Sequence, residues 1–173
     1  MQTTLVMTLI GPDRTGLVED VARIVASQGG NWLESRMCRL GGEFAGILRV
    51  ETPVEKRDTL MAALQAIPKL QVIGHVDAAA APKTHARLAR LELVGTDRPG
   101  IVREITGAMT RFHVNVEEFS SELLSAPMSG QTLFKASACL SLPSECPLDA
   151  LKKELETIAS DLLVDLAFTE MKD

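Results

Sequence analysis

Hydrophobic and polar positions along the chain follow two periods, and the same succession of periods occurs twice. Short runs of aliphatic and β-branched residues, typical of strands, alternate with segments in which apolar residues recur every three or four positions, as on one face of a helix. The helices expected to begin at Leu17 and at Ile101 carry matching stripes, with apolar residues at positions i, i+4, i+7 and i+8. Each half therefore predicts the order strand, helix, strand, strand, helix, strand.

Glycine pairs mark two of the breaks in these patterns. Gly29-Gly30 is expected to end the first helix, and Gly41-Gly42 to form a tight hairpin turn. In the second half the segment 125–130 replaces that turn, an insertion where a function unique to this half would lie. Strands are expected at 4–10, 31–40, 44–51, 70–76, 88–94, 115–124, 134–142 and 162–168, and helices at 17–28, 60–67, 101–112 and 148–158.

A six-residue motif is repeated together with the periodicity. Gly-Pro-Asp-Arg-Thr-Gly at 11–16 returns as Gly-Thr-Asp-Arg-Pro-Gly at 95–100, and each copy joins the first strand of its half to the first helix. Asn31, just after the first helix, returns in the same register as Asn115. A repeat that spans half of the chain sets the number of domains at two.

The repeat and the element order together predict the architecture. Two domains are expected at residues 1–77 and 88–173, joined by a linker at 78–87 that has no apolar face to bury. The predicted fold class is α+β, with two tandem ferredoxin-like βαββαβ domains, each an antiparallel sheet with two helices on one face. Because such a sheet leaves edges and one face uncovered, we expect a homo-oligomer.

Composition narrows the classes of partner. A net charge of −5 argues against direct binding of nucleic acid, which relies on a basic face that displaces counterions. The longest apolar runs fall well short of the roughly 18 residues that a membrane helix needs, and the N-terminus does not have the pattern of a secretory signal. We therefore expect a cytoplasmic protein with no membrane and no direct nucleic-acid partner.

Residue types that carry catalysis are sparse. The three histidines, at 75, 85 and 113, lie at a strand end, in the linker and at a helix end, and no pair has the spacing of metal ligands. Cys38 and Cys139 are expected to be small buried side chains within strands. We expect no catalytic residue, metal site or cofactor, and rank a ligand-binding regulator above an enzyme.

The repeated turn can bind a small ligand. A helix start exposes unpaired backbone N–H groups at the positive end of the helix dipole, which suits a carboxylate. Gly16 and Gly100 would let a ligand approach the backbone, or else permit close packing of helix on sheet. Asp13 and Asp97 are expected either to cap the helices or to contact the ligand.

Two interpretations are also open for the arginines of the repeated turns and for the two asparagines. Arg14 and Arg98 are expected on exposed first turns, either facing a partner or in solvent. Asn31 and Asn115 carry both a donor and an acceptor that could read an ammonium group. They could equally adopt a left-handed conformation after a helix end.

The motif resembles the ACT domain, a small ligand-sensing module. Its pattern is a strand, then Gly-x-Asp-Arg-x-Gly-[Leu/Ile]-Val opening a helix, then Asn after that helix. The second copy fits this motif better than the first, because Pro99 is present where the first copy has Thr15. Two such modules without a catalytic or DNA-binding domain resemble the family of glycine cleavage system transcriptional repressors.

This resemblance implies a regulator that binds an amino acid such as glycine and restrains a separate transcription factor without touching DNA. The alternative that it leaves open is a module that modulates a metabolic enzyme. ACT modules generally bind their ligands where two modules meet. The ligand-binding residues implied are Asp13, Arg14, Gly16 and Asn31 in the first repeat, and Asp97, Arg98, Pro99, Gly100 and Asn115 in the second.

Overall fold

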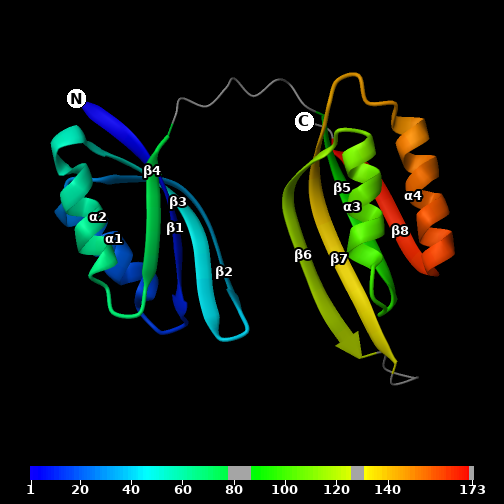
Figure 1. The fold of residues 1–173 in the computed structure, drawn as a ribbon, viewed down its shortest axis with the longest axis horizontal. Coiled ribbons are helices and arrows are strands. Elements are labelled where there is room, and N and C mark those ends of the chain that lie inside the picture. The colour runs from blue at the N-terminus through cyan, green and yellow to red at the C-terminus, as the bar shows by residue number, and fades with distance from the viewer. Residues whose placement is uncertain (78–86, 126–130, 172–173) are drawn as a thin grey trace. The chain divides into compact units, whose positions relative to one another are not determined.

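The computed structural model describes residues 1–77, 87–125 and 131–171, which form two compact units, Met1–Ala81 and Pro82–Asp173 (Figure 1). The expected linker at 78–87 lies outside the described residues except for Arg87, which already belongs to a strand. The insertion at 125–130 also lies outside them, except for Ser125 at the end of a strand.

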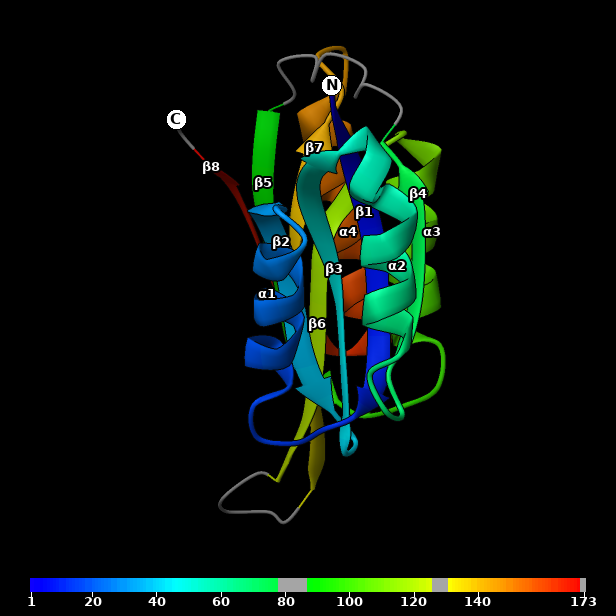
Figure 2. The ribbon, with the colours of Figure 1, turned by 90° about the vertical axis from the view of Figure 1, so that its left-hand side faces the viewer.

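The first unit is a four-stranded antiparallel sheet with strand order β2-β3-β1-β4. Its helices α1 and α2 stand together in front of one face of the sheet (Figure 2). A single 3-10 turn precedes α2, a detail that the periodicity did not predict. The elements are β1 (Gln2–Pro12), α1 (Leu17–Ser27), β2 (Asn31–Leu40), β3 (Glu43–Pro53), η1 (Val54–Lys56), α2 (Arg57–Gln65) and β4 (Gln71–Val76).

The second unit repeats this topology, with strand order β6-β7-β5-β8. Its last helix runs on to Leu162, a residue predicted to start the final strand. The elements are β5 (Arg87–Thr96), α3 (Ile101–Arg111), β6 (Asn115–Ser125), β7 (Thr132–Leu142), α4 (Leu148–Leu162) and β8 (Val164–Met171). The predicted fold class, two tandem ferredoxin-like units, is confirmed.

Each unit has its own hydrophobic core between its helices and its sheet. Alternate residues of β1 and β3 point to the helices, and burial of each aliphatic side chain contributes about 1.5–3 kcal/mol. The first core is centred on Leu5, Met7, Leu9, Leu48, Leu60 and Leu64; the second on Leu91, Ile105, Met109, Leu140, Leu151 and Leu155.

The first helix of each unit ends in the same hydrogen-bonded motif. In α1, Gly29 donates to the Ala26 carbonyl and Gly30 to the Val25 carbonyl, with Gly29 at φ 72°. This is the Schellman pattern, whose left-handed residue favours glycine. In α3 the same two bonds occur, but the left-handed residue is His113, at φ 55°.

We therefore expect His113→Gly to stabilise the second unit by about 0.5–1 kcal/mol. A non-glycine residue in the left-handed conformation costs about 1 kcal/mol or more, and glycine removes this strain. Part of the gain is lost because glycine also raises the conformational entropy of the unfolded chain. Urea unfolding measures the effect. The reverse change, Gly29→His, is the matched control and should destabilise. A loss of stability in His113→Gly would show that the imidazole itself contributes.

The cysteines differ from expectation. Cys38 is exposed, so the prediction that it is buried was wrong, because β2 is an edge strand with little covering it. Cys139 is partly exposed, and Cys146 is buried. Burial raises the pKa of the Cys146 thiol. Since the thiolate is the reactive form, we expect Cys146 to react last with a thiol reagent in native protein, and at the same rate as the others in denaturant.

Within the described ranges, none of the helices is long and apolar enough to cross a membrane. The same residues bring together no group of three His, Cys, Asp or Glu side chains that could hold a metal ion.

Candidate functional site

The first repeated turn connects β1 to α1 and is built around a left-handed glycine. Gly16 is the residue before the helix, at φ 82°, and its carbonyl accepts the N–H of Asp20 at 2.9 Å. No side chain caps this helix. The prediction that Asp13 caps it was wrong, because Asp13 lies too far before the helix start and its carboxylate pairs with Arg39 Nε at 2.7 Å.

The second turn repeats this backbone between β5 and α3. Gly100 precedes the helix at φ 100°, again with no side-chain cap. Asp97, also predicted as a cap, instead donates its backbone N–H to the Thr132 carbonyl at 3.0 Å. Pro99, which lies between Asp97 and Gly100 in the chain, is exposed. The Thr15 and Pro99 copies therefore share one turn conformation.

Gly16 and Gly100 are required by conformation, not by packing. A Cβ at either position would meet nothing within 4 Å, so the suggestion that these glycines permit close helix–sheet packing was wrong. Both lie in the left-handed region, where a side chain is strained. Because no atom crowds them, the backbone of both turns is open to a ligand.

The two asparagines lie away from the turns of their own units. Asn31 opens β2 and pairs with Glu51, which pairs with Thr4 near the start of β1, whereas the turn follows the end of β1. Helix α1, about 16 Å long for its 11 residues, separates them. Neither Asn31 nor Asn115 is left-handed, so that expectation was wrong too.

Asn115 occupies the corresponding place in the second unit. It is the first residue of β6, is exposed, and its Nδ2 donates to Glu117 Oε1 at 2.9 Å. Because each first helix runs back along its sheet, residues at its two ends cannot share a small ligand within one unit. The predicted site residues therefore divide into a turn group and an asparagine group.

The first turn borders a surface hollow of about 240 Å³. Its far wall is the loop before β4, which sequence reasoning did not connect with the turn. A Cβ on Gly11 would lie 2.5 Å from the Lys69 carbonyl oxygen, so this loop is packed directly on the end of β1. The lining residues are Gly11, Pro12, Asp13, Arg14, Leu17, Pro68, Lys69 and Leu70.

Two cations, Arg14 and Lys69, line this hollow. Arg14 Nη2 lies 2.5 Å from the Asp20 carboxylate, but Asp20 also accepts from Arg23 at 2.7 Å and would keep that partner. Hydrogen bonds from Arg14 and then Arg23 lower the pKa of Asp20 below its usual value. Lys69 is exposed and has no ion-pair partner within the described part of the chain. With Asp13 neutralised by Arg39, the hollow has a positive balance.

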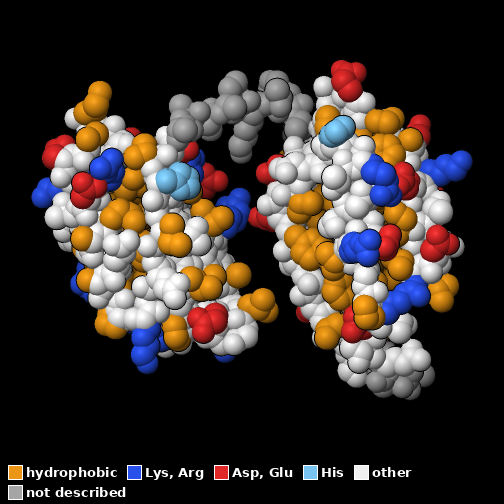
Figure 3. All heavy atoms as spheres, in the orientation of Figure 1, with side chains coloured by type: hydrophobic (Ala, Val, Ile, Leu, Met, Phe, Trp, Pro, Cys, Tyr) orange, Lys and Arg blue, Asp and Glu red, His pale blue; other side chains and the backbone are white. Residues whose placement is uncertain are grey.

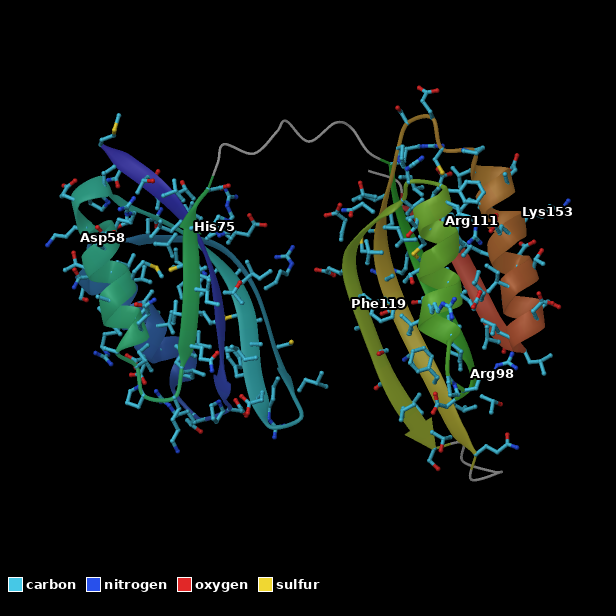
Figure 4. The ribbon with its side chains drawn as sticks, in the orientation of Figure 1. Asp58, His75, Arg98, Arg111, Phe119 and Lys153 are labelled. Atoms are coloured by element: carbon cyan, nitrogen blue, oxygen red, sulfur yellow. The ribbon has the colours of Figure 1, made fainter. Side chains whose placement is uncertain are left out.

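The second turn borders a different hollow, of about 430 Å³. Its wall is largely apolar and comes from the turn, the first turn of α3 and Phe134 of β7. Other hydrophobic side chains gather between α3 and β6 (Figure 3). Phe119 of β6, on the same side of the sheet as α3, is labelled in Figure 4. The lining residues are Asp97, Arg98, Gly100, Ile101, Val102, Arg103 and Phe134.

Arg98 is bonded to backbone, whereas Arg14 pairs with a carboxylate. Its Nη2 donates to the Asp161 carbonyl at 2.9 Å, in the last turn of α4 (Figure 4). A guanidinium there satisfies an unpaired helix carbonyl and complements the negative end of the helix dipole. The left-handed residue before the last strand is Lys69 in the first unit but Leu163, 80% exposed, in the second. The two turns therefore share a backbone conformation, but the cation that Lys69 adds beside the first turn has no counterpart at Leu163.

The fold and the turns define a class of protein, one with a tandem ACT-like fold. Residues 3–73, which make up most of the first unit, match the family model of the ACT domain. Among curated proteins, none matches this sequence.

Two solved structures have the same fold over the whole chain. A protein of unknown function from Galdieria sulphuraria is 27% identical, with a TM-score of 0.89, over 99% of this chain and 100% of that chain. A second structure, provisionally described as a glycine cleavage system transcriptional repressor, is 21% identical with a TM-score of 0.71, over 100% of this chain and 99% of that chain.

Proposed function

We propose that this chain is a regulatory protein without catalytic activity that binds the carboxylate of an amino acid at the turn between β1 and α1. The observation that carries this proposal is the hollow beside an open left-handed glycine, with the cations of Arg14 and Lys69 on its two sides. Backbone N–H groups at the start of α1 add the positive end of its dipole.

The regulatory part of the proposal is supported by the match of residues 3–73 to the family model of the ACT domain, a small ligand-sensing module. More specifically, we propose that the chain is a cytoplasmic accessory repressor of glycine cleavage genes that acts through a DNA-binding partner. The supports for this role are the motifs in both halves, the net charge of −5 and the end-to-end likeness of fold to the provisionally assigned repressor. In this account glycine is the first ligand to test.

Thermal unfolding in the presence of each amino acid tests ligand binding. A ligand at about 100 times its Kd adds about 2.7 kcal/mol to the stability of the native state, which raises Tm by about 10 °C or more in a domain of this size. Arg14→Gln should raise the Kd about tenfold or more, because a charge-assisted hydrogen bond is lost.

The matched control is Arg57→Gln, which removes an equally exposed arginine of the same unit that pairs with Asp58 outside the hollow. Lys69→Asn should weaken binding as well, because it removes the second cation of the hollow. Asparagine tolerates the left-handed backbone at this position, so the loop should keep its conformation. If no amino acid raises Tm, or if Arg14→Gln and Arg57→Gln behave alike, the ligand proposal is wrong.

A second experiment addresses DNA. A gel-shift titration of the purified chain with glycine cleavage promoter DNA at physiological salt should give no specific complex, because the chain lacks the basic surplus that phosphate contacts require. A sequence-specific complex formed by the chain alone would contradict action through a partner.

A further inference from the structure

One face of the first sheet is apolar although no helix of its unit covers it. Neighbouring residues of a strand point to opposite faces. Since Leu5, Met7, Leu9 and Leu48 fill the core, the residues between them point the other way. Ile10, Ile47 and Ile73 are 42%, 53% and 73% exposed. We call this the isoleucine face; it consists of Val6, Thr8, Ile10, Ala45, Ile47 and Ile73.

The strand register makes this face continuous. Thr8 of β1 pairs with Ile47 of β3 on one side and Ile73 of β4 on the other, and Ile10 pairs with Ala45. Three adjacent strands therefore present one uncharged area. Isolated exposed apolar residues are ordinary, but a contiguous apolar area marks an interaction surface.

Charged residues border the isoleucine face on the side of the edge strand β2. Arg36 of β2 pairs in register with Ile47 and so lies beside this face, and Glu34 pairs in register with Arg49. Arg49 donates to Glu34 at 3.0 Å and to Asp77 at 2.9 Å. His75 of β4, labelled in Figure 4, pairs with Val6, the residue of β1 that also pairs with Arg49. Covering the isoleucines would leave the Arg49 pairs in place at the rim, where partial solvation limits the cost of desolvating them.

The corresponding face of the second sheet is charged, so the apolar character is not a property of the fold. There, Ser137 occupies the place of Ile47, and its hydroxyl bonds with that of Ser120 at 2.8 Å. On the three strands that correspond to β1, β3 and β4, the charged side chains of this face are Arg90, Glu92, Lys135 and Asp165. The edge strand β6 adds Glu118 and Glu122, where β2 of the first sheet carries Glu34 and Arg36. An apolar area that only one of two repeated units carries requires an explanation of its own.

We propose that the isoleucine face is the interface of a homodimer, packed against the same face of a second copy about a two-fold axis. An isologous interface brings a patch against itself. Self-contact is favourable here because β1, β3 and β4 carry no charge at the centre of the face, so no carboxylate is buried there, and Arg36 of the edge strand β2 lies at its rim. A charged surface such as the Glu-rich face of the second sheet would bury carboxylates against isoleucine, which selects a like face as the occupant.

This interface stands apart from the ligand proposal, because the isoleucine face contains none of the residues of the first turn. Sedimentation velocity over a dilution series of the full chain tests it. The wild type should be a dimer, and Ile47→Asp and Ile73→Asp should each raise the dimer Kd by about 30-fold or more, as for the central residues of an interface. Both positions are exposed within the unit, so the far-UV spectrum and Tm of monomeric protein should be retained.

Ser137→Asp is the matched control, since it adds the same charge at the equivalent place on the second sheet, and its dimer Kd should equal that of the wild type. Thr8→Cys should crosslink two copies by a disulfide under mild oxidation, because Thr8 lies at the centre of the face. The proposal is overturned if the wild type is monomeric at all concentrations, or if dimers persist in both aspartate variants. It is equally overturned if Ser137→Asp dissociates the dimer as they do.

Discussion

Replacing Leu48 with alanine is expected to lower the free energy of unfolding of the first unit by about 2–5 kcal/mol, the range for a fully buried leucine. Leu48 is 0% exposed on β3, in the core between the sheet and its two helices. Its removal leaves a cavity that strands fixed on both sides cannot close, because β3 is held between β1 and β2.

Hydrogen exchange, read separately for the two units, measures this effect. Protection should fall in the first unit and be retained in the second, because the two cores share no residue. Leu140→Ala, at an equally buried position of β7, should give the opposite result. An equal loss of protection throughout the chain in both variants would contradict the description of two separate cores.

Gly11→Ala is expected to lower the stability of the first unit by about 1–3 kcal/mol and to weaken ligand binding at the same time. The added Cβ would lie 2.5 Å from the Lys69 carbonyl oxygen and 3.2 Å from the Leu70 Cα. Both contacts are with backbone, so no side-chain rotation relieves them. The loop that carries Lys69 has to move away from the turn, and the hollow changes shape.

Gly41→Ala is the control for Gly11→Ala. Gly41 lies in the β2–β3 turn at φ 61°, and its Cβ would meet nothing within 4 Å. Alanine there costs backbone strain of about 1 kcal/mol, without displacing the loop before β4. Chemical unfolding and ligand titration of both variants separate the effects. If Gly11→Ala binds ligand as the wild type does, Lys69 does not contribute to the site.

The sequence was sufficient for the architecture because short-range periodicity determines it. The stripes on Leu17–Val25 and Ile101–Met109 place one face of each helix on a sheet, and the repeated motif sets the domain count. The glycine pair at 29–30 was also predicted correctly, since a Schellman ending is a local structure. His113, its counterpart, was not, because histidine is not a usual sign of a left-handed residue.

The candidate site was predicted less well, because its contacts are distant in sequence. Lys69 reaches the first turn only because β4 pairs with β1. Arg98 faces the end of α4, more than 60 residues later in the chain. Asn31 follows the far end of a helix that runs back along the sheet. Motif spacing contains none of this information. It favoured the second turn because of Pro99, whereas the contacts that add a cation beside the first turn come from the loop before β4.

We propose above that the turn between β1 and α1 binds an amino-acid carboxylate. Titration of the 15N-labelled protein with glycine, and then with the other amino acids, tests it residue by residue. The claim requires amide shifts confined to Asp13–Leu17 and to Lys69, with a common Kd, that disappear in Arg14→Gln and persist in Arg57→Gln. Shifts at the Asp97–Gly100 turn alone, or none with any amino acid, would contradict it.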